Sequence, residues 1–128
     1  MTQSIATIAL LVADYDEAIG YYRDVLGFAL LADTPLGDRK RWVLVGTAGG
    51  ARLLLARADG PGQVARIGDQ TGGSVGFFLE TDDFARDHAL YVERGVRFLE
   101  APRTEVYGTV AVFEDLYGNK WDLIEPKR

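Results

Sequence analysis

Short apolar segments alternate with polar, glycine-containing segments along the whole chain, and their spacing predicts a mixture of strands and helices. The first apolar run, Ile8–Val12, is continuous and has the length of a buried strand. Asp14 is followed three residues later by Glu17, which resembles a capping box at a helix start, and Gly27 ends that helix. Apolar residues recur between these points at helical spacing, at Ala18, Ile19, Tyr22, Val25 and Leu26.

Three further strands are predicted after this helix in the sequence. They cover Phe28–Ala32, Arg41–Gly46 and Arg52–Ala56, and turns that contain proline or glycine separate them. The first half of the chain is therefore predicted to form a strand, a helix and three strands in that order.

The second half repeats this order after a shift of 67 positions. One inserted residue makes the shift 68 in the elements that follow the second helix. A second helix is predicted from about Asp82 to Gly95. Because the register holds through successive elements, we interpret the chain as a duplication. The aligned strands are Thr7–Val12 with Ser74–Leu79, Trp42–Val45 with Val110–Phe113, and Arg52–Ala56 with Lys120–Ile124.

The duplication predicts an α+β fold in which tandem βαβββ modules form a curved, partly closed mixed sheet with a central concavity. We expect one domain over residues 1–128, with modules at about 4–57 and 74–126 and a linker at about 58–73 that contains Pro61. A sheet covered by one helix has one bare face, and a hollow over such a face suits a small ligand.

Composition and charge exclude several kinds of partner and site. The chain has 128 residues, a formal net charge of −5 and no cysteine. An acidic protein repels a phosphate backbone, so we expect no nucleic-acid partner. The absence of cysteine excludes disulfides, thiolate metal sites and a cysteine nucleophile. The apolar run Ile5–Val12 is too short to cross a membrane and lacks the flanks of an export signal, so we expect a cytoplasmic protein without a membrane partner.

Two phrases of the sequence resemble the vicinal oxygen chelate superfamily, which includes glyoxalases, bleomycin-resistance proteins and extradiol dioxygenases. One is the opening Val12–Ala18 with Leu26-Gly27-Phe28, and the other is the ending Val112–Pro126. The resemblance covers essentially the whole chain and implies the fold described above. It also implies a homodimer. This fold carries several unrelated chemistries, so the resemblance does not define the activity.

In the metal enzymes of that family, the ligands come from the first and last strands of each copy. Carried over by resemblance, these positions are Thr7, Leu54, Ser74 and Asp122. Metal enzymes generally use histidine, glutamine or glutamate there, but this set has one carboxylate, two hydroxyls and a leucine. We therefore expect no metal or other cofactor, and a divalent metal is the disfavoured alternative.

Asp122 is the best candidate for a functional side chain, although no catalytic residue is assigned. Strand alternation turns Trp121 and Leu123 toward the helices and Asp122 toward the concavity. There it is a candidate general base or ligand anchor, or it simply accepts hydrogen bonds. Arg52 lies on the same face as Leu54 and is a candidate for binding an anionic group, or it pairs with acids at the rim.

Aromatic residues are candidates either for lining the concavity or for the core. Phe78 is included among the ligand-binding candidates, together with Thr7, Arg52, Leu54, Ser74 and Asp122. His88 is the only histidine, and its helical stripe predicts a core or boundary position. The basic cluster 39–41 is predicted to be a solvated strand edge.

These observations lead to one hypothesis and two alternatives. The leading hypothesis is metal-independent binding of a small apolar or aromatic molecule in the sheet concavity. The first alternative is an enzyme, namely a metal-dependent lyase, isomerase or dioxygenase with an atypical site. The second is a non-catalytic interaction module whose hollow is filled by its own side chains.

Overall fold

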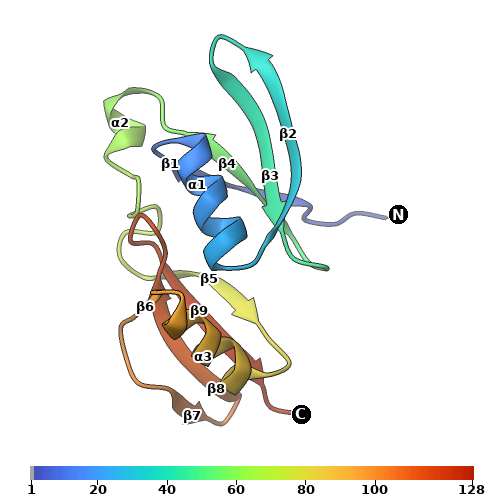
Figure 1. The fold of residues 1–128 in the computed structure, drawn as a ribbon, viewed down its shortest axis with the longest axis vertical. Coiled ribbons are helices and arrows are strands. Elements are labelled where there is room, and N and C mark those ends of the chain that lie inside the picture. The colour runs from blue at the N-terminus through green and yellow to red at the C-terminus, as the bar shows by residue number, and fades with distance from the viewer. Residues whose placement is uncertain (1) are drawn as a thin grey trace. The chain divides into compact units, whose positions relative to one another are not determined.

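The computed structural model describes residues 2–128 of the chain. The chain divides into two compact units, Met1–Ile67 and Gly68–Arg128, and the boundary lies inside the predicted linker. Each unit contains one mixed sheet with one main helix (Figure 1). The predicted α+β class and the order of elements within each module are therefore confirmed. No helix in residues 2–128 has the length and apolar character needed to cross a membrane.

Unit 1 contains a four-stranded sheet in the order β1-β4-β3-β2, in which only β1 and β4 run parallel. The predicted linker contains a further short helix, α2. The elements are β1 (Thr7–Val12), α1 (Tyr15–Gly20), the π-helix η1 (Tyr21–Val25), β2 (Ala29–Gly37), β3 (Lys40–Gly46), β4 (Arg52–Arg57) and α2 (Gly60–Val64).

Unit 2 contains a second sheet in the order β5-β9-β8-β6, with β7 also paired to β8. Here β5 and β9 run parallel, and β9 lies between β5 and β8. The elements are β5 (Val75–Glu80), α3 (Phe84–Glu93), β6 (Arg97–Phe98), β7 (Arg103–Glu105), β8 (Gly108–Glu114) and β9 (Lys120–Pro126).

Both main helices begin at an aspartate. Asp14 caps α1 and accepts a hydrogen bond from the Glu17 backbone N–H at 2.8 Å, which confirms the predicted cap. Asp83 caps α3 in the same way, since its carboxylate accepts a hydrogen bond from the Arg86 backbone N–H at 3.1 Å. This helix therefore begins slightly later than predicted. Gly27 and Gly95 follow the two helices in the left-handed conformation, with φ of 79° and 84°.

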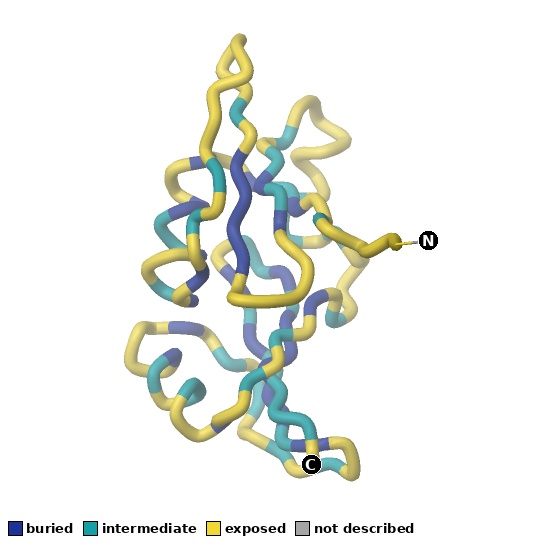
Figure 2. Tube along the Cα trace, turned by 90° about the vertical axis from the view of Figure 1, so that its right-hand side faces the viewer, coloured by how far each residue is buried: buried dark blue, intermediate teal, exposed yellow. Residues whose placement is uncertain are grey.

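One face of each sheet forms the core of its unit against the main helix. In unit 1 the fully buried side chains include Leu10, Val43 and Leu55. In unit 2 the Phe113 and Trp121 rings stack with centroids 5.8 Å apart, and neither ring lies open to solvent. Buried segments follow the strands, whereas loops and the β2–β3 hairpin tip are exposed (Figure 2).

The edge strands of the two units differ from the prediction. β2 continues to Gly37, beyond the predicted end at Ala32, because Asp38 and Arg39 take left-handed conformations that close a long hairpin with β3. In unit 2 the equivalent edge is split into β6 and β7. Between them, the Glu100 carboxylate accepts a hydrogen bond from the Val112 backbone N–H at 2.9 Å in place of a strand partner.

The repeat register is confirmed for the last two strands of each unit. Leu54 lies opposite Leu44, and Asp122 lies opposite Val112, so Leu54 and Asp122 occupy matching positions. The predicted register of the first strands is wrong. Thr7 pairs with Arg52, but Val75 rather than Ser74 pairs with Lys120.

This difference of one residue is already present at Val75, and a bulge at Gly76 adds a second one, because the pairing of β5 with β9 shifts between Val75 and Phe77. A Cβ atom at Gly76 would lie 2.3 Å from Thr71 Cγ2, so the close approach of Thr71 requires glycine there. Beyond the bulge Phe78 lies opposite Asp122, as Ala9 lies opposite Leu54 in unit 1.

Candidate functional site

The sheet face away from α1, called the unit 1 face here, is apolar along its centre. Strand alternation and register place six apolar side chains of β1, β3 and β4 there, and Thr34 of the edge strand β2 lies opposite Trp42. Trp42 is 43% exposed and is the largest of them. Thr7 and Arg52 lie opposite each other at one end of this face. The six residues are Ala9, Leu11, Trp42, Leu44, Leu54 and Ala56.

The corresponding surface away from α3, the unit 2 face, combines an exposed ring with a buried carboxylate. Phe78 is 65% exposed, although a phenylalanine in a strand is usually covered. Its register partner on β9 is Asp122, which is only 8% exposed. Val112 lies on the other side of Asp122, on β8. The carboxylate therefore sits in the middle of the sheet, between an aromatic and an aliphatic neighbour.

Asp122 has the orientation that alternation predicted, since its neighbours Trp121 and Leu123 are buried in the core. Its Oδ1 atom is buried and accepts no hydrogen bond within the chain. Burial raises the pKa of the Asp122 carboxyl above its ordinary value. The nearby charge of Arg103 opposes that rise in pKa, and the charge of Glu100 adds to it.

A network centred on Arg103 borders this carboxylate. The Arg103 Nε donates to the Glu100 carboxylate at 3.1 Å, and Nη1 donates to Glu105 at 2.8 Å and to the Tyr107 hydroxyl at 3.2 Å. These hydrogen bonds raise the pKa of Arg103, so it stays a cation. Sequence reasoning missed Glu100 and Arg103 because they lie in the split edge of unit 2, which has no counterpart in unit 1.

Of the remaining predicted residues, Ser74 belongs to unit 2 and Arg52 to unit 1. Ser74 lies outside β5, is exposed, and its hydroxyl donates to the Thr71 carbonyl at 3.4 Å. The Lys120 Nζ donates to the Gly73 carbonyl at 2.9 Å, so this amine helps to hold the loop before β5. Arg52 is exposed beside Thr7 on the unit 1 face.

The donor set at the family's metal positions does not match what a transition metal requires. Leu54 has no donor atom, and Thr7 offers a neutral hydroxyl. In unit 2 Val75 occupies the position predicted for Ser74, which leaves Asp122 as the one strong donor. Across residues 2–128 no three histidine, aspartate or glutamate side chains gather in a way that could hold a metal ion.

Two other polar residues have structural roles. His88 lies between the rings of Phe84 and Phe98, with centroids 5.4 and 4.4 Å away, at the predicted boundary of the core. The buried Asp115 carboxylate organises the predicted turn before β9. It accepts hydrogen bonds from the Tyr117 and Asn119 backbone N–H groups, from the Asn119 amide and from the Trp121 indole.

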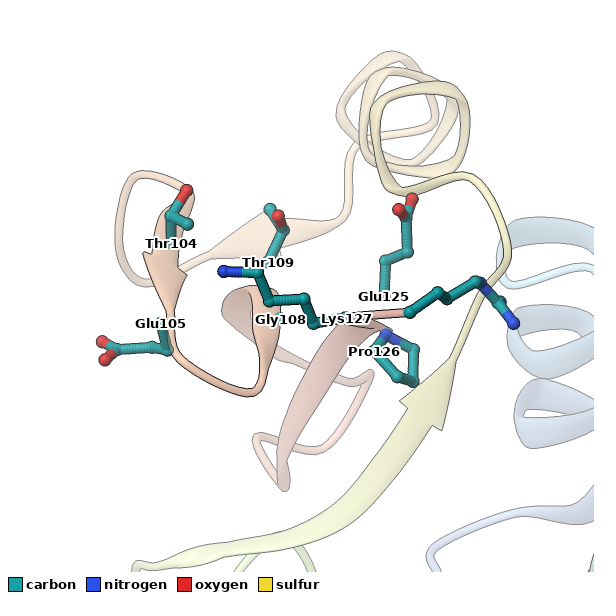
Figure 3. A pocket seen from close by; sticks show the side chains of 8 residues that line it. Thr104, Glu105, Gly108, Thr109, Glu125, Pro126 and Lys127 are labelled. Carbon is teal, nitrogen blue, oxygen red and sulfur yellow. The ribbon is translucent and has the colours of Figure 1, made fainter.

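A shallow hollow of about 230 Å³ lies elsewhere on unit 2, near the β7–β8 turn (Figure 3). Glu125 points toward α3, where it accepts a hydrogen bond from the Phe84 backbone N–H at 2.8 Å. Glu105 already pairs with Arg103. Because both carboxylates have partners, this hollow is a weaker candidate than the unit 2 face. Its lining is Thr104, Glu105, Gly108, Thr109, Glu125, Pro126, Lys127 and Arg128.

Known proteins resemble this chain over almost its full length. An uncharacterized protein of Shewanella frigidimarina (strain NCIMB 400) is 53% identical over 128 residues, which cover 98% of this chain and 95% of the relative. TnmS3, an antibiotic binding protein from Streptomyces sp. CB03234, is 32% identical with a TM-score of 0.79, and the match covers 98% of each chain.

A glyoxalase/bleomycin resistance protein from the same Streptomyces strain is 34% identical with a TM-score of 0.73, covering 94% of this chain and 99% of that one. The sequence model of one family matches residues 4–123. Together with the two βαβββ units, this match shows that the chain belongs to the Glyoxalase/Bleomycin resistance protein/Dioxygenase superfamily.

Proposed function

We propose that this protein binds a small apolar or aromatic molecule, without a metal, on its bare sheet faces. The observation that carries the proposal is the apolar character of these faces, on which Trp42 and Phe78 are the large exposed side chains. Exposed apolar patches on a folded chain generally mark sites of binding. Flat rings supply a large contact area for an aromatic ligand.

Two further observations support binding rather than metal-assisted catalysis. The side chains at the family's metal positions offer a single carboxylate, Asp122, on a scaffold that is otherwise intact. The structural likeness to TnmS3, an antibiotic binding protein, favours a ligand-binding role for this chain as well. Fold alone does not define activity, so this likeness supports the proposal only alongside the composition of the faces.

The exposed Trp42 provides a direct test. The chain has two tryptophans, of which Trp42 is 43% exposed and Trp121 is 4% exposed. Titration with 2-naphthalenemethanol, a neutral aromatic probe, should raise the melting temperature and shift or quench the Trp42 emission. In a Trp42→Phe variant, the remaining Trp121 emission should not respond, because that indole lies in the core.

The result that would overturn the proposal is equally clear. No change in melting temperature and no fluorescence response up to millimolar probe would contradict binding of apolar molecules at these faces. Elemental analysis of protein purified without chelators is the companion experiment. A stoichiometric transition metal that disappears in Asp122→Ala would contradict the metal-independent function.

A further inference from the structure

The buried carboxylate of Asp122 narrows the chemistry of the ligand, provided that the proposed binding function holds. Its Oδ1 is buried without a partner in the middle of the sheet, while its neighbours Phe78 and Val112 are apolar. A buried acceptor without a donor is unfavourable in the free protein. A ligand that brings a hydrogen-bond donor to this oxygen would remove that penalty on binding.

Charge decides which kind of donor fits. The carboxylates of Glu100 and Glu105 lie on either side of Arg103, and both already take hydrogen bonds from its guanidinium. Asp122 adds a third carboxylate near Glu100, whereas the amine of Lys120, the neighbouring cation on β9, donates to the Gly73 carbonyl. The part of unit 2 around Asp122, Glu100 and Glu105 is therefore negative overall and attracts a cation. An anionic group would be repelled, and Arg103 is already engaged by acids of its own chain.

The exposed ring of Phe78 fits the same ligand. It lies opposite Asp122 on the neighbouring strand and is 65% exposed, so its face is open to a bound molecule. An aromatic face attracts an ammonium group and also stacks on a ligand ring. We therefore infer that the ligand of the unit 2 face is an amphipathic primary or secondary amine, whose ammonium group donates a hydrogen bond to Asp122 while its apolar body packs on Phe78.

Three probes with one ring system test this inference on the full-length chain. They are 2-naphthylmethylamine, the neutral 2-naphthalenemethanol and the anionic 2-naphthoate, compared by isothermal titration calorimetry at pH 7.5. A charge-assisted hydrogen bond in a partly desolvated site should make the amine bind about tenfold more tightly than the alcohol. The naphthoate should bind most weakly.

Two variants locate the effect. Asp122→Asn keeps the size of the side chain but removes its charge, so it should lower the affinity for the amine to that for the alcohol. The affinity for the alcohol should change by less than about twofold, which also shows that the variant is folded. Glu114→Gln is the matched control, because Glu114 belongs to the same face but pairs with Arg97 at 3.6 Å. It should keep the preference for the amine.

The possible outcomes separate this inference from the proposed function. Equal affinities for amine and alcohol, a preference for naphthoate, or an undiminished preference for the amine in Asp122→Asn would each overturn the inference. The binding function would stand in those cases, because the alcohol still binds. If none of the three probes binds, the proposed function fails and the inference fails with it.

Discussion

Replacing Asp122 with leucine should stabilise the protein, although this residue is buried and central. Leucine is the residue at the matching position of the first repeat, Leu54, so the fold already accepts it in that place. The substitution removes an oxygen that is buried without a partner, a feature that costs about 1–3 kcal/mol. We therefore expect Asp122→Leu to raise the free energy of unfolding by about 1–3 kcal/mol at pH 7.

A second buried aspartate of the same unit provides the control. Asp115 is 6% exposed, close to the 8% of Asp122, but four donor groups bind its carboxylate, three in the turn and the Trp121 indole on β9. Asp115→Leu leaves the Trp121 indole and the Asn119 N–H groups buried without an acceptor. It should lower the free energy of unfolding by at least about 3 kcal/mol. The two aspartates are buried to a similar extent, but their replacement by leucine should change the free energy of unfolding in opposite directions.

Urea unfolding in a Trp42→Phe background measures both changes, since Trp121 is then the only tryptophan and it reports on unit 2. The pH dependence gives an independent check. The folded-state pKa of Asp122 is raised, so the cost of ionising this buried carboxyl is absent below its ordinary pKa and develops as the pH rises from there to the raised value. The advantage of Asp122→Leu should therefore shrink as the pH falls toward 3.8, the ordinary value. A loss of stability in Asp122→Leu at pH 7 would refute the reasoning.

Four further outcomes are expected. Phe113→Ala should cost about 3–5 kcal/mol in urea unfolding, because the ring is fully buried, whereas Phe113→Leu should cost less. Gly68→Ala should destabilise unit 2 strongly, since its Cβ would lie 1.9 Å from the Tyr117 carbonyl oxygen and φ is 77°; an unchanged midpoint would contradict that geometry. Arg41→Gln should cost less than about 1 kcal/mol, because its pair with Asp33 is near the surface, and the loss should vanish in high salt. The homodimer expected from the family resemblance should appear as twice the chain mass in light scattering, and a monomer at all concentrations would contradict it.

The order of elements was predictable because each element leaves a local signature in the sequence. Asp14 and Gly27 bound the first helix through interactions between near neighbours along the chain. The repeat also carried tertiary information, since it matched Leu54 with Asp122 before any pairing was known. That match placed Leu54, which has no donor atom, at a position where the family resemblance predicts a metal ligand.

Other features depend on contacts between distant residues. The bulge at Gly76 lies where Thr71 packs against the start of β5, and it adds a one-residue shift to the pairing of β5 with β9 that the alignment of the repeats did not predict. The extent of β2 depended on the turn at Asp38 and Arg39, where two residues without a glycine's freedom adopt positive φ.

The sequence alone determined that Asp122 points away from the core, because strand periodicity is a local rule. Only the tertiary structure decided what surrounds it. The charges of Glu100 and Arg103, on the irregular edge of unit 2, act on the pKa of this carboxylate, yet no donor of the chain hydrogen-bonds to Oδ1. No pattern along the chain predicts that a buried oxygen lacks a hydrogen-bond donor. That depends on which residues, distant in the sequence, pack close enough to donate to it.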